Sequence, residues 1–284
     1  MMLLSYITWN ADPAVFTIPF LGREIRWYAF AFVIGFALGL WIVKKIWKNE
    51  NLNPEWYDSL FLYVVIATVV GARLGHVLFY DPGYYFSHPI EILKTWKGGL
   101  ASHGGTIGII IAIWIYSKKV THKSMLWTFD RLVVPVGFVA ALIRLGNLMN
   151  SEIYGGATTL PWGFKFVRDL ENCLKGNPCY DWTTTAVHPT QIYEALLYTL
   201  TGFICLWMYW KRKDYKYEGL IFGVFLIGIF LSRFFVEFLK NNQVAFEDSM
   251  ILNMGQLLSI PFILVGIWLT WRGLKNKSLC FKSK

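Results

Sequence analysis

Charged side chains are scarce in this chain of 284 residues, where Asp, Glu, Lys and Arg together make up only 16%. Apolar residues make up 55%, aromatic residues 18%, and the mean hydropathy is +0.43. This composition excludes an ordinary soluble domain and is typical of a protein that crosses a membrane several times. The chain has room for roughly six to eight helices of about 20 residues, so we expect a single membrane domain over residues 1–284.

Cysteine is also rare, and no metal-binding motif occurs. Of the four cysteines, Cys173 and Cys179 share one loop, where they could pair in an oxidising compartment. Cys205 is expected inside a helix and Cys280 in the C-terminal tail. None has the neighbouring ligands that a zinc site needs, so we expect neither a metal nor a cofactor. The N-terminus lacks the features of a cleaved signal peptide, and the first span is expected to act as its own signal.

Long apolar runs predict seven membrane-spanning helices. They lie near residues 27–43, 58–80, 100–117, 128–150, 191–210, 219–239 and 250–271. The third run is short and rich in glycine, so its signal is the weakest. The expected fold is an all-α polytopic membrane protein.

The net charge of +9 arises from basic residues that flank the apolar runs. Segments 44–57, 117–124, 211–217 and 272–284 hold fifteen Lys and Arg, whereas the longer segments on the other side hold eight. The positive-inside rule therefore predicts an N-terminus outside and a C-terminus in the cytoplasm. Topology and contact with anionic lipids explain this charge without nucleic-acid binding. The outer segment 151–190 is too long for a simple connection and is expected to form a small cap between the fourth and fifth spans.

Several ionisable residues fall inside the predicted spans, where each costs about 2.5–3.5 kcal/mol to insert near a helix centre. Such residues need a partner or a function. They are Arg73, His76, His103, Arg131, Arg144, Glu194, Arg233 and Glu237. We expect a structural role for Arg131, whose side chain can reach the cytoplasmic interface.

Arg144 and Arg233 lie near the outer ends of two different spans, so their guanidinium groups could meet. Two such cations would repel each other unless an anion lay between them, and guanidinium geometry suits phosphate. The alternative is that each arginine pairs with a carboxylate. Glu237 could serve Arg233, and Glu152 or Glu194 could serve Arg144.

The stretch RLGNLMNSEIYGG, residues 144–156, closes the fourth apolar run with polar side chains. On a helix, Arg144, Asn147 and Ser151 would form one stripe, with Asn150 beside it. The stripe indicates a ligand site, or else polar contacts to neighbouring helices and a helix cap.

Two further segments gather polar groups at the same boundary. In KGGLASHGGTIG, residues 97–108, the glycine spacing that begins at Gly104 allows close helix packing. Alternatively, exposed N–H groups at this helix start add an anion site, with His103 as a proton acceptor or donor. HPTQIYEA, residues 188–195, places Glu194 there as well.

Together these segments resemble the prolipoprotein diacylglyceryl transferase family over nearly the whole chain. The resemblance rests on IRWYAFAFVIGF (25–36), GARLGHVLFYDP (71–82), HGG (103–105), RLGNLMNSEIYG (144–155), HPTQIYEA (188–195), RFFVEF (233–238) and MGQLLSIP (254–261). Residues 144–155 look like the family signature. There are two departures: Ile143 stands where the signature usually has glycine, and Ile229 where a tyrosine is common.

The resemblance implies a bacterial inner-membrane enzyme that transfers the diacylglyceryl group of phosphatidylglycerol to the thiol of a lipobox cysteine. A thioether forms and glycerol phosphate leaves. The implied partners are phosphatidylglycerol, the lipobox region of prolipoprotein signal peptides and membrane lipids. Family motif positions implicated in activity fall on Tyr28, His103, Arg144, Asn147, Glu152, Gly155, Arg233 and Glu237. We add Gly104, Asn150 and Glu194 as candidates for substrate binding.

The chemistry of this reaction needs charge stabilisation on the departing phosphate and a thiolate nucleophile. We assign the first task to Arg144 and Arg233. His103 is the candidate base, unless it only orients the lipid or the protein substrate. Asn147 and Glu152 bind the headgroup or align Arg144.

Two other classes of function are compatible with paired arginines in a membrane. An anion or lipid transporter is the main alternative. Against it, the polar groups gather at one face rather than at the midplane, and no duplicated halves are visible. A non-catalytic lipid-binding scaffold is the third possibility.

Overall fold

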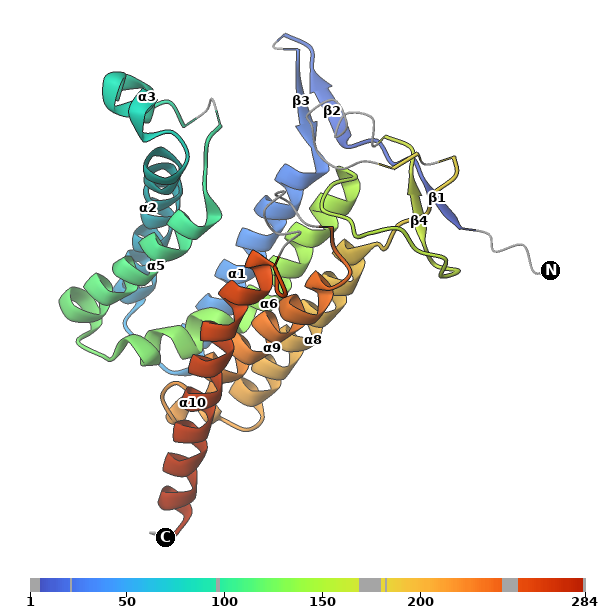
Figure 1. Ribbon diagram of the computed structural model, residues 1–284. Helices are drawn as coiled ribbons and strands as arrows, with labels where there is room; N and C mark the ends of the chain where they lie inside the picture. Colours follow the sequence, from blue (N-terminus) through green and yellow to red (C-terminus); the bar gives the residue numbers. More distant parts are fainter. Residues whose placement is uncertain are drawn as a thin grey trace. The chain divides into compact units, whose positions relative to one another are not determined.

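The computed structural model describes residues 6–20, 22–95, 98–168, 180–181, 183–241 and 250–282. In these residues the chain is mostly helical (Figure 1). It divides into two compact units, of which the first comprises residues 1–42 and 132–284 and the second residues 43–131.

Six helices in the described residues are long and apolar enough to cross a membrane. They are α1 (Trp27–Asn49), α2 (Pro54–Phe79), α6 (Met125–Met149), α8 (Thr190–Trp210), α9 (Leu220–Glu237) and α10 (Met254–Lys282). The prediction of an all-α polytopic membrane protein is thereby confirmed for the spanning part. The third predicted span corresponds to α5 (Ser102–Tyr116), whose fifteen residues are fewer than the about 20 needed for a full crossing. A π-helical turn, η2 (Ser117–Thr121), extends it.

Glycines let the helices of the first unit approach closely. Gly137 of α6 faces Gly202 of α8, and a Cβ on Gly137 would lie 2.7 Å from the Gly202 nitrogen. Gly266 of α10 faces Gly223 of α9 in the same way, with 2.9 Å between its Cβ position and the Gly223 carbonyl oxygen. Lipid tails are as apolar as the helices, so close packing of this kind holds membrane helices together. It places α6, α8, α9 and α10 beside one another (Figure 1).

Four short strands lie outside the spanning helices. β1 (Ile7–Trp9) pairs in parallel with β4 (Phe164–Phe166), and β2 (Ala14–Ile18) forms an antiparallel hairpin with β3 (Arg23–Arg26). The first strand therefore joins the segment predicted as a cap, which sequence reasoning missed because three residues carry no usable periodicity. That residues 151–190 form a separate cap stays a prediction. Cys173 and Cys179 lie outside the described residues.

In the second unit, α2 and α5 are packed against each other through glycine. A Cβ on Gly104 would lie 2.3 Å from the Gly71 carbonyl oxygen and 2.6 Å from the Gly75 Cα. The close packing expected from the glycine spacing is therefore present. The anion-binding role of Gly104 stays a prediction.

Arg131 has a structural role in the second unit. It forms an ion pair with Glu50, and its guanidinium lies 3.9 Å from the centre of the Trp127 ring. The arginine is only 2% exposed, and a largely buried acid and an aromatic face balance its charge. That its side chain reaches the cytoplasmic interface stays a prediction.

Arg73 stabilises the connection that leads into α5. Two short helices, α3 (Pro82–Ser87) and α4 (Pro89–Ile92), follow α2. The buried Arg73 guanidinium donates hydrogen bonds of 2.5–3.0 Å to the carbonyls of Glu91, Ile92, Gly98 and Gly99. All three guanidinium nitrogens of Arg73 donate hydrogen bonds to backbone carbonyls. These bonds explain a buried charged residue in α2 without a ligand.

We predict that Gly137→Ala destabilises the protein, because the added methyl group meets backbone atoms of α8. Overpacking of this kind costs about 1–3 kcal/mol. Gly39→Ala is the matched control, since its Cβ would lie 3.7 Å from Val139 Cγ2, an ordinary contact. Thermal unfolding in detergent should show a lower midpoint for Gly137→Ala and an unchanged or higher one for Gly39→Ala. Equal midpoints for the two variants would contradict the packing argument.

Candidate active site

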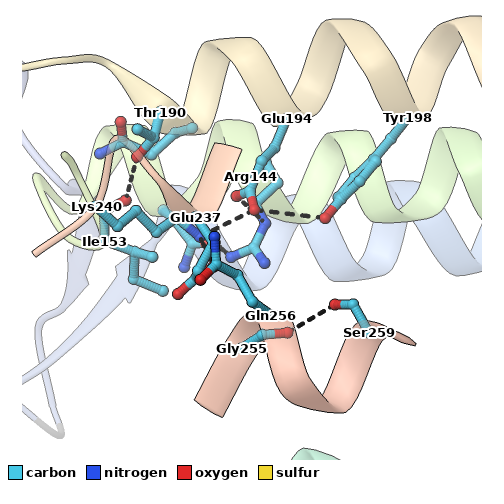
Figure 2. Close-up of polar contacts among 12 residues, drawn as sticks. Arg144, Ile153, Thr190, Glu194, Tyr198, Glu237, Lys240, Gly255, Gln256 and Ser259 are labelled. Carbon is cyan, nitrogen blue, oxygen red and sulfur yellow. Dashed lines mark hydrogen bonds and ion pairs between the residues drawn. The ribbon is translucent and has the colours of Figure 1, made fainter. Parts of the chain in front are cut away.

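Arg144, near the end of α6, forms an ion pair with Glu194 of α8. Its Nε lies 2.8 Å from Glu194 Oε2, and the Glu194 side chain is completely buried. The N–H does not point directly at this oxygen, so the contact is an ion pair rather than an aligned hydrogen bond. Tyr198, one turn along α8, donates a hydrogen bond to Glu194 Oε1 at 3.5 Å (Figure 2) and is close enough to Arg144 to interact with it electrostatically. Of the two acids considered for Arg144, Glu194 is the partner.

Lys240 contributes a second cation to this cluster. Its Nζ lies 2.9 Å from Glu194 Oε1 and 3.4 Å from Glu237 Oε2. The lysine side chain is only 7% exposed, although it directly follows the sixth predicted span, 219–239, where a loop is expected. The two carboxylates therefore share one ammonium group, which links the end of α9 to α8 (Figure 2).

Two glycines make room around these charges. A Cβ on Gly255, at the start of α10, would lie 2.7 Å from the Glu237 carboxyl carbon. A Cβ on Gly155 would lie 2.4 Å from the Leu239 carbonyl oxygen, and the Gly155 N–H donates to the His188 carbonyl at 2.8 Å. Gly155 thus connects the segment after α6 to those around α8 and α9. Its proposed part in substrate binding stays a prediction.

A row of amides extends from Arg144 along the segment after α6. Arg144 Nη1 donates to Asn147 Oδ1 at 3.4 Å, and Asn147 Nδ2 donates to Glu152 Oε1 at 2.8 Å. Asn150 Nδ2 donates to the same carboxylate oxygen at 3.1 Å. Tyr28 of α1 is close enough to Arg144 and Glu152 to interact with both electrostatically. The structure thus brings together these five candidates from the sequence.

The predicted polar stripe ends earlier than expected. The helix α6 ends at Met149, and Ser151 has a left-handed backbone with φ of 54°. Ser151 therefore does not continue the stripe of Arg144 and Asn147. The chain turns there, and the turn brings Glu152 back toward the asparagines.

Arg233 of α9 lies beside the same cluster. Both arginines, Arg144 and Arg233, interact electrostatically with Tyr198. The Nε atom of Arg233 is buried, and no group in the described part of the chain accepts a hydrogen bond from it. Glu237, the partner considered for Arg233, is instead in an ion pair with Lys240. The cluster thus contains a buried cationic donor that an anion would satisfy.

His103 belongs to the second unit, at the start of α5. Its side chain is exposed, and its ring packs against Phe79 and Tyr80 with centroid distances of 5.1 Å and 5.9 Å. Its role as a base stays a prediction. No group of three or more His, Cys, Asp or Glu within the described ranges is arranged to hold a metal ion.

Comparison with known proteins identifies the family of this chain. A model of the prolipoprotein diacylglyceryl transferase family matches residues 13–272. The chain belongs to this family. It is 57% identical to the phosphatidylglycerol–prolipoprotein diacylglyceryl transferase of Porphyromonas gingivalis, over 97% of this chain and 98% of the relative. The relatives from Tolumonas auensis (41% identity, 95% and 98% covered) and Chloroherpeton thalassium (40%, 97% and 97%) carry the same name.

As a diacylglyceryl transferase, the chain is a multi-pass membrane enzyme whose candidate site draws on several helices. Sequence reasoning missed three members of the cluster: Tyr198, Lys240 and Gly255. Tyr198 lies one turn after Glu194 and Lys240 lies three residues after Glu237, so helical spacing was a usable signal for both. No local signal marks Gly255, because its contact comes from another helix.

We predict that Lys240→Met destabilises this transferase, since it leaves two buried carboxylates facing each other. Removing one partner of a buried ion pair costs about 3–5 kcal/mol. The double variant Lys240→Met with Glu237→Gln should recover part of the loss, because it also removes one of the negative charges. Thermal unfolding in detergent measures both. A double variant less stable than the single one would show that the lysine does not act by balancing these acids.

Proposed function

We propose that this diacylglyceryl transferase transfers the diacylglyceryl group of phosphatidylglycerol to the lipobox cysteine of prolipoproteins, in the inner membrane of a bacterium. The names of its relatives specify these two substrates. The structural observation that carries the proposal is the buried Nε of Arg233, which has no partner within the described residues and lies in the cluster of Arg144. A phosphodiester is the kind of anion that such a donor binds.

The reaction forms one bond and breaks one bond. The cysteine sulfur attacks the terminal glycerol carbon of the diacylglyceryl group, and a C–S bond replaces the C–O bond to phosphate. Glycerol phosphate leaves with the bonding electron pair and gains negative charge. The thiol proton passes to a base, because the thiolate is the reactive form.

Arg144 and Arg233 stabilise the charge that develops on the departing phosphate. Glu194 and Asn147 hold Arg144 in place, so its guanidinium does not have to reorganise during the reaction. Preorganised donors of this kind are worth about 10²–10³ in rate each. Arg233 contributes the donor that no group within the described residues satisfies.

A groove between α9 and α10 suits an acyl chain of the donor lipid. Its volume is about 160 Å³, and only apolar side chains line it. These are Leu231, Phe234, Phe235, Ile260, Ile263 and Leu264. Residues of α9, the helix that also carries Arg233, line one side of the groove, so a lipid with its phosphate at the arginine can lay a chain along the same helix. A donor with two acyl chains needs such an opening toward the bilayer.

His103 is the proposed base, and it accepts the thiol proton. An imidazole can be neutral near pH 7 and is the side chain most often used for this task. Its exposed position at the start of α5 leaves the ring accessible to a peptide substrate.

We predict that Arg144→Lys and Arg233→Lys each lower turnover by about 100-fold or more, because an ammonium cannot reproduce the guanidinium fork. The assay is transfer of lipid from phosphatidylglycerol to a lipobox peptide by the purified protein, followed by mass spectrometry. Arg131→Lys is the control, since Arg131 pairs with Glu50 in the second unit and should keep near-normal turnover. Near-normal rates in the first two variants would remove the phosphate role of the arginines.

For His103→Gln we expect kcat to fall by about 10²–10⁴, the usual contribution of a general base. The residual rate should rise with pH as hydroxide begins to ionise the thiol. Glutamine keeps a polar side chain but no basicity, so binding of the lipid should be retained. A full rate across the pH range would exclude His103 as the base.

A further inference from the structure

Two buried amide oxygens near Glu152 lack a hydrogen-bond donor within the described residues. They are Asn150 Oδ1 and Gln191 Oε1. Gln191 is completely buried at the start of α8. A buried acceptor without a donor lowers stability, so its presence in a folded site points to a missing partner.

The hydrogen bonds made by the nitrogen of each amide identify which of its two terminal atoms is the oxygen. Asn150 Nδ2 lies 3.1 Å from Glu152 Oε1, and Gln191 Nε2 lies 2.7 Å from the Glu152 backbone oxygen. An ionised carboxylate and a carbonyl accept hydrogen bonds only, so the amino group of each amide must face Glu152. The two oxygens are therefore the ends that remain without a partner.

The neighbouring amide of Asn147 shows the contrast. Its Nδ2 also donates to Glu152, at 2.8 Å, but its Oδ1 accepts from Arg144 at 3.4 Å. Glu152 thus links the Arg144–Asn147 pair to the two amides whose buried oxygens have no donor within the described residues. A ligand that matches these groups would place an anion at the Arg144 guanidinium and hydroxyl groups at the oxygens of Asn150 and Gln191.

We infer that Asn150 and Gln191 select the donor lipid by accepting hydrogen bonds from the hydroxyl groups of its glycerol headgroup. This inference rests on the proposed function and specifies that the site recognises the glycerol headgroup of the lipid. Phosphatidylglycerol carries two free hydroxyls next to its phosphate. A headgroup without hydroxyls leaves both acceptors unpaired, and a site built to hydrogen-bond a hydroxyl discriminates strongly against such an analogue. An ethanolamine headgroup brings donors but adds a positive charge near Arg144, which is unfavourable.

The test compares two donor lipids with identical acyl chains, phosphatidylglycerol and phosphatidylpropanol, on the wild-type enzyme. Both carry one phosphodiester charge, and the second lacks the hydroxyls. We expect kcat/KM to be lower for phosphatidylpropanol by about tenfold or more. Equal values would overturn the inference while leaving the transfer reaction intact. If phosphatidylglycerol itself gave no product, the proposed function would fail instead.

A pair of variants tests the residues. Gln191→Met removes the open acceptor at similar length, and the preference for phosphatidylglycerol should fall by about tenfold through loss of activity on that lipid. Thr190→Val is the matched control, because Thr190 Oγ1 donates to the Ile153 carbonyl at 2.9 Å and holds the same segment without an open acceptor. This variant should keep the wild-type preference. An unchanged preference in Gln191→Met, or an equal loss in Thr190→Val, would overturn the assignment. If Gln191→Met fails to fold, the comparison of lipids on the wild-type enzyme decides alone.

Discussion

A buried network of alternating charges connects the ends of three helices in this transferase. Arg144 of α6 and Lys240 after α9 both pair with Glu194 of α8, and Lys240 also pairs with Glu237. Burying a single ion costs several kcal/mol, so none of these groups would be stable here alone. Each therefore depends on the others, and the positions of the helix ends depend on all of them.

In the proposed function, the same network prepares the site for an anion. Glu194 and Asn147 orient Arg144, while Arg233 keeps a buried donor without a partner in the described residues. One arginine is thus held in place, and we propose that a ligand satisfies the other. The same charged residues serve both the structural ion pairs and the proposed catalysis. This explains why so many ionisable residues lie in this cluster.

Close packing through glycine supports this arrangement. Gly137 allows α6 to meet α8, and Gly255 allows α10 to meet the Glu237 carboxylate. A side chain at either position would displace backbone or a charged group. In the second unit, Gly99 has a positive φ of 71°, and its missing Cβ leaves space for Arg73. At Gly255 and Gly99 the missing side chain therefore makes room for a charged group.

The sequence by itself determined the approximate limits of six of the seven predicted spanning helices, because hydropathy over about 20 residues is a local property. It also determined the family and most candidate residues, since the motifs are continuous stretches. Only the tertiary structure decided that Arg144 pairs with Glu194 rather than Glu152, that Lys240 is buried, and that β1 joins β4. These contacts join segments far apart in the chain, and their formation depends on how the helices pack, which no local pattern encodes.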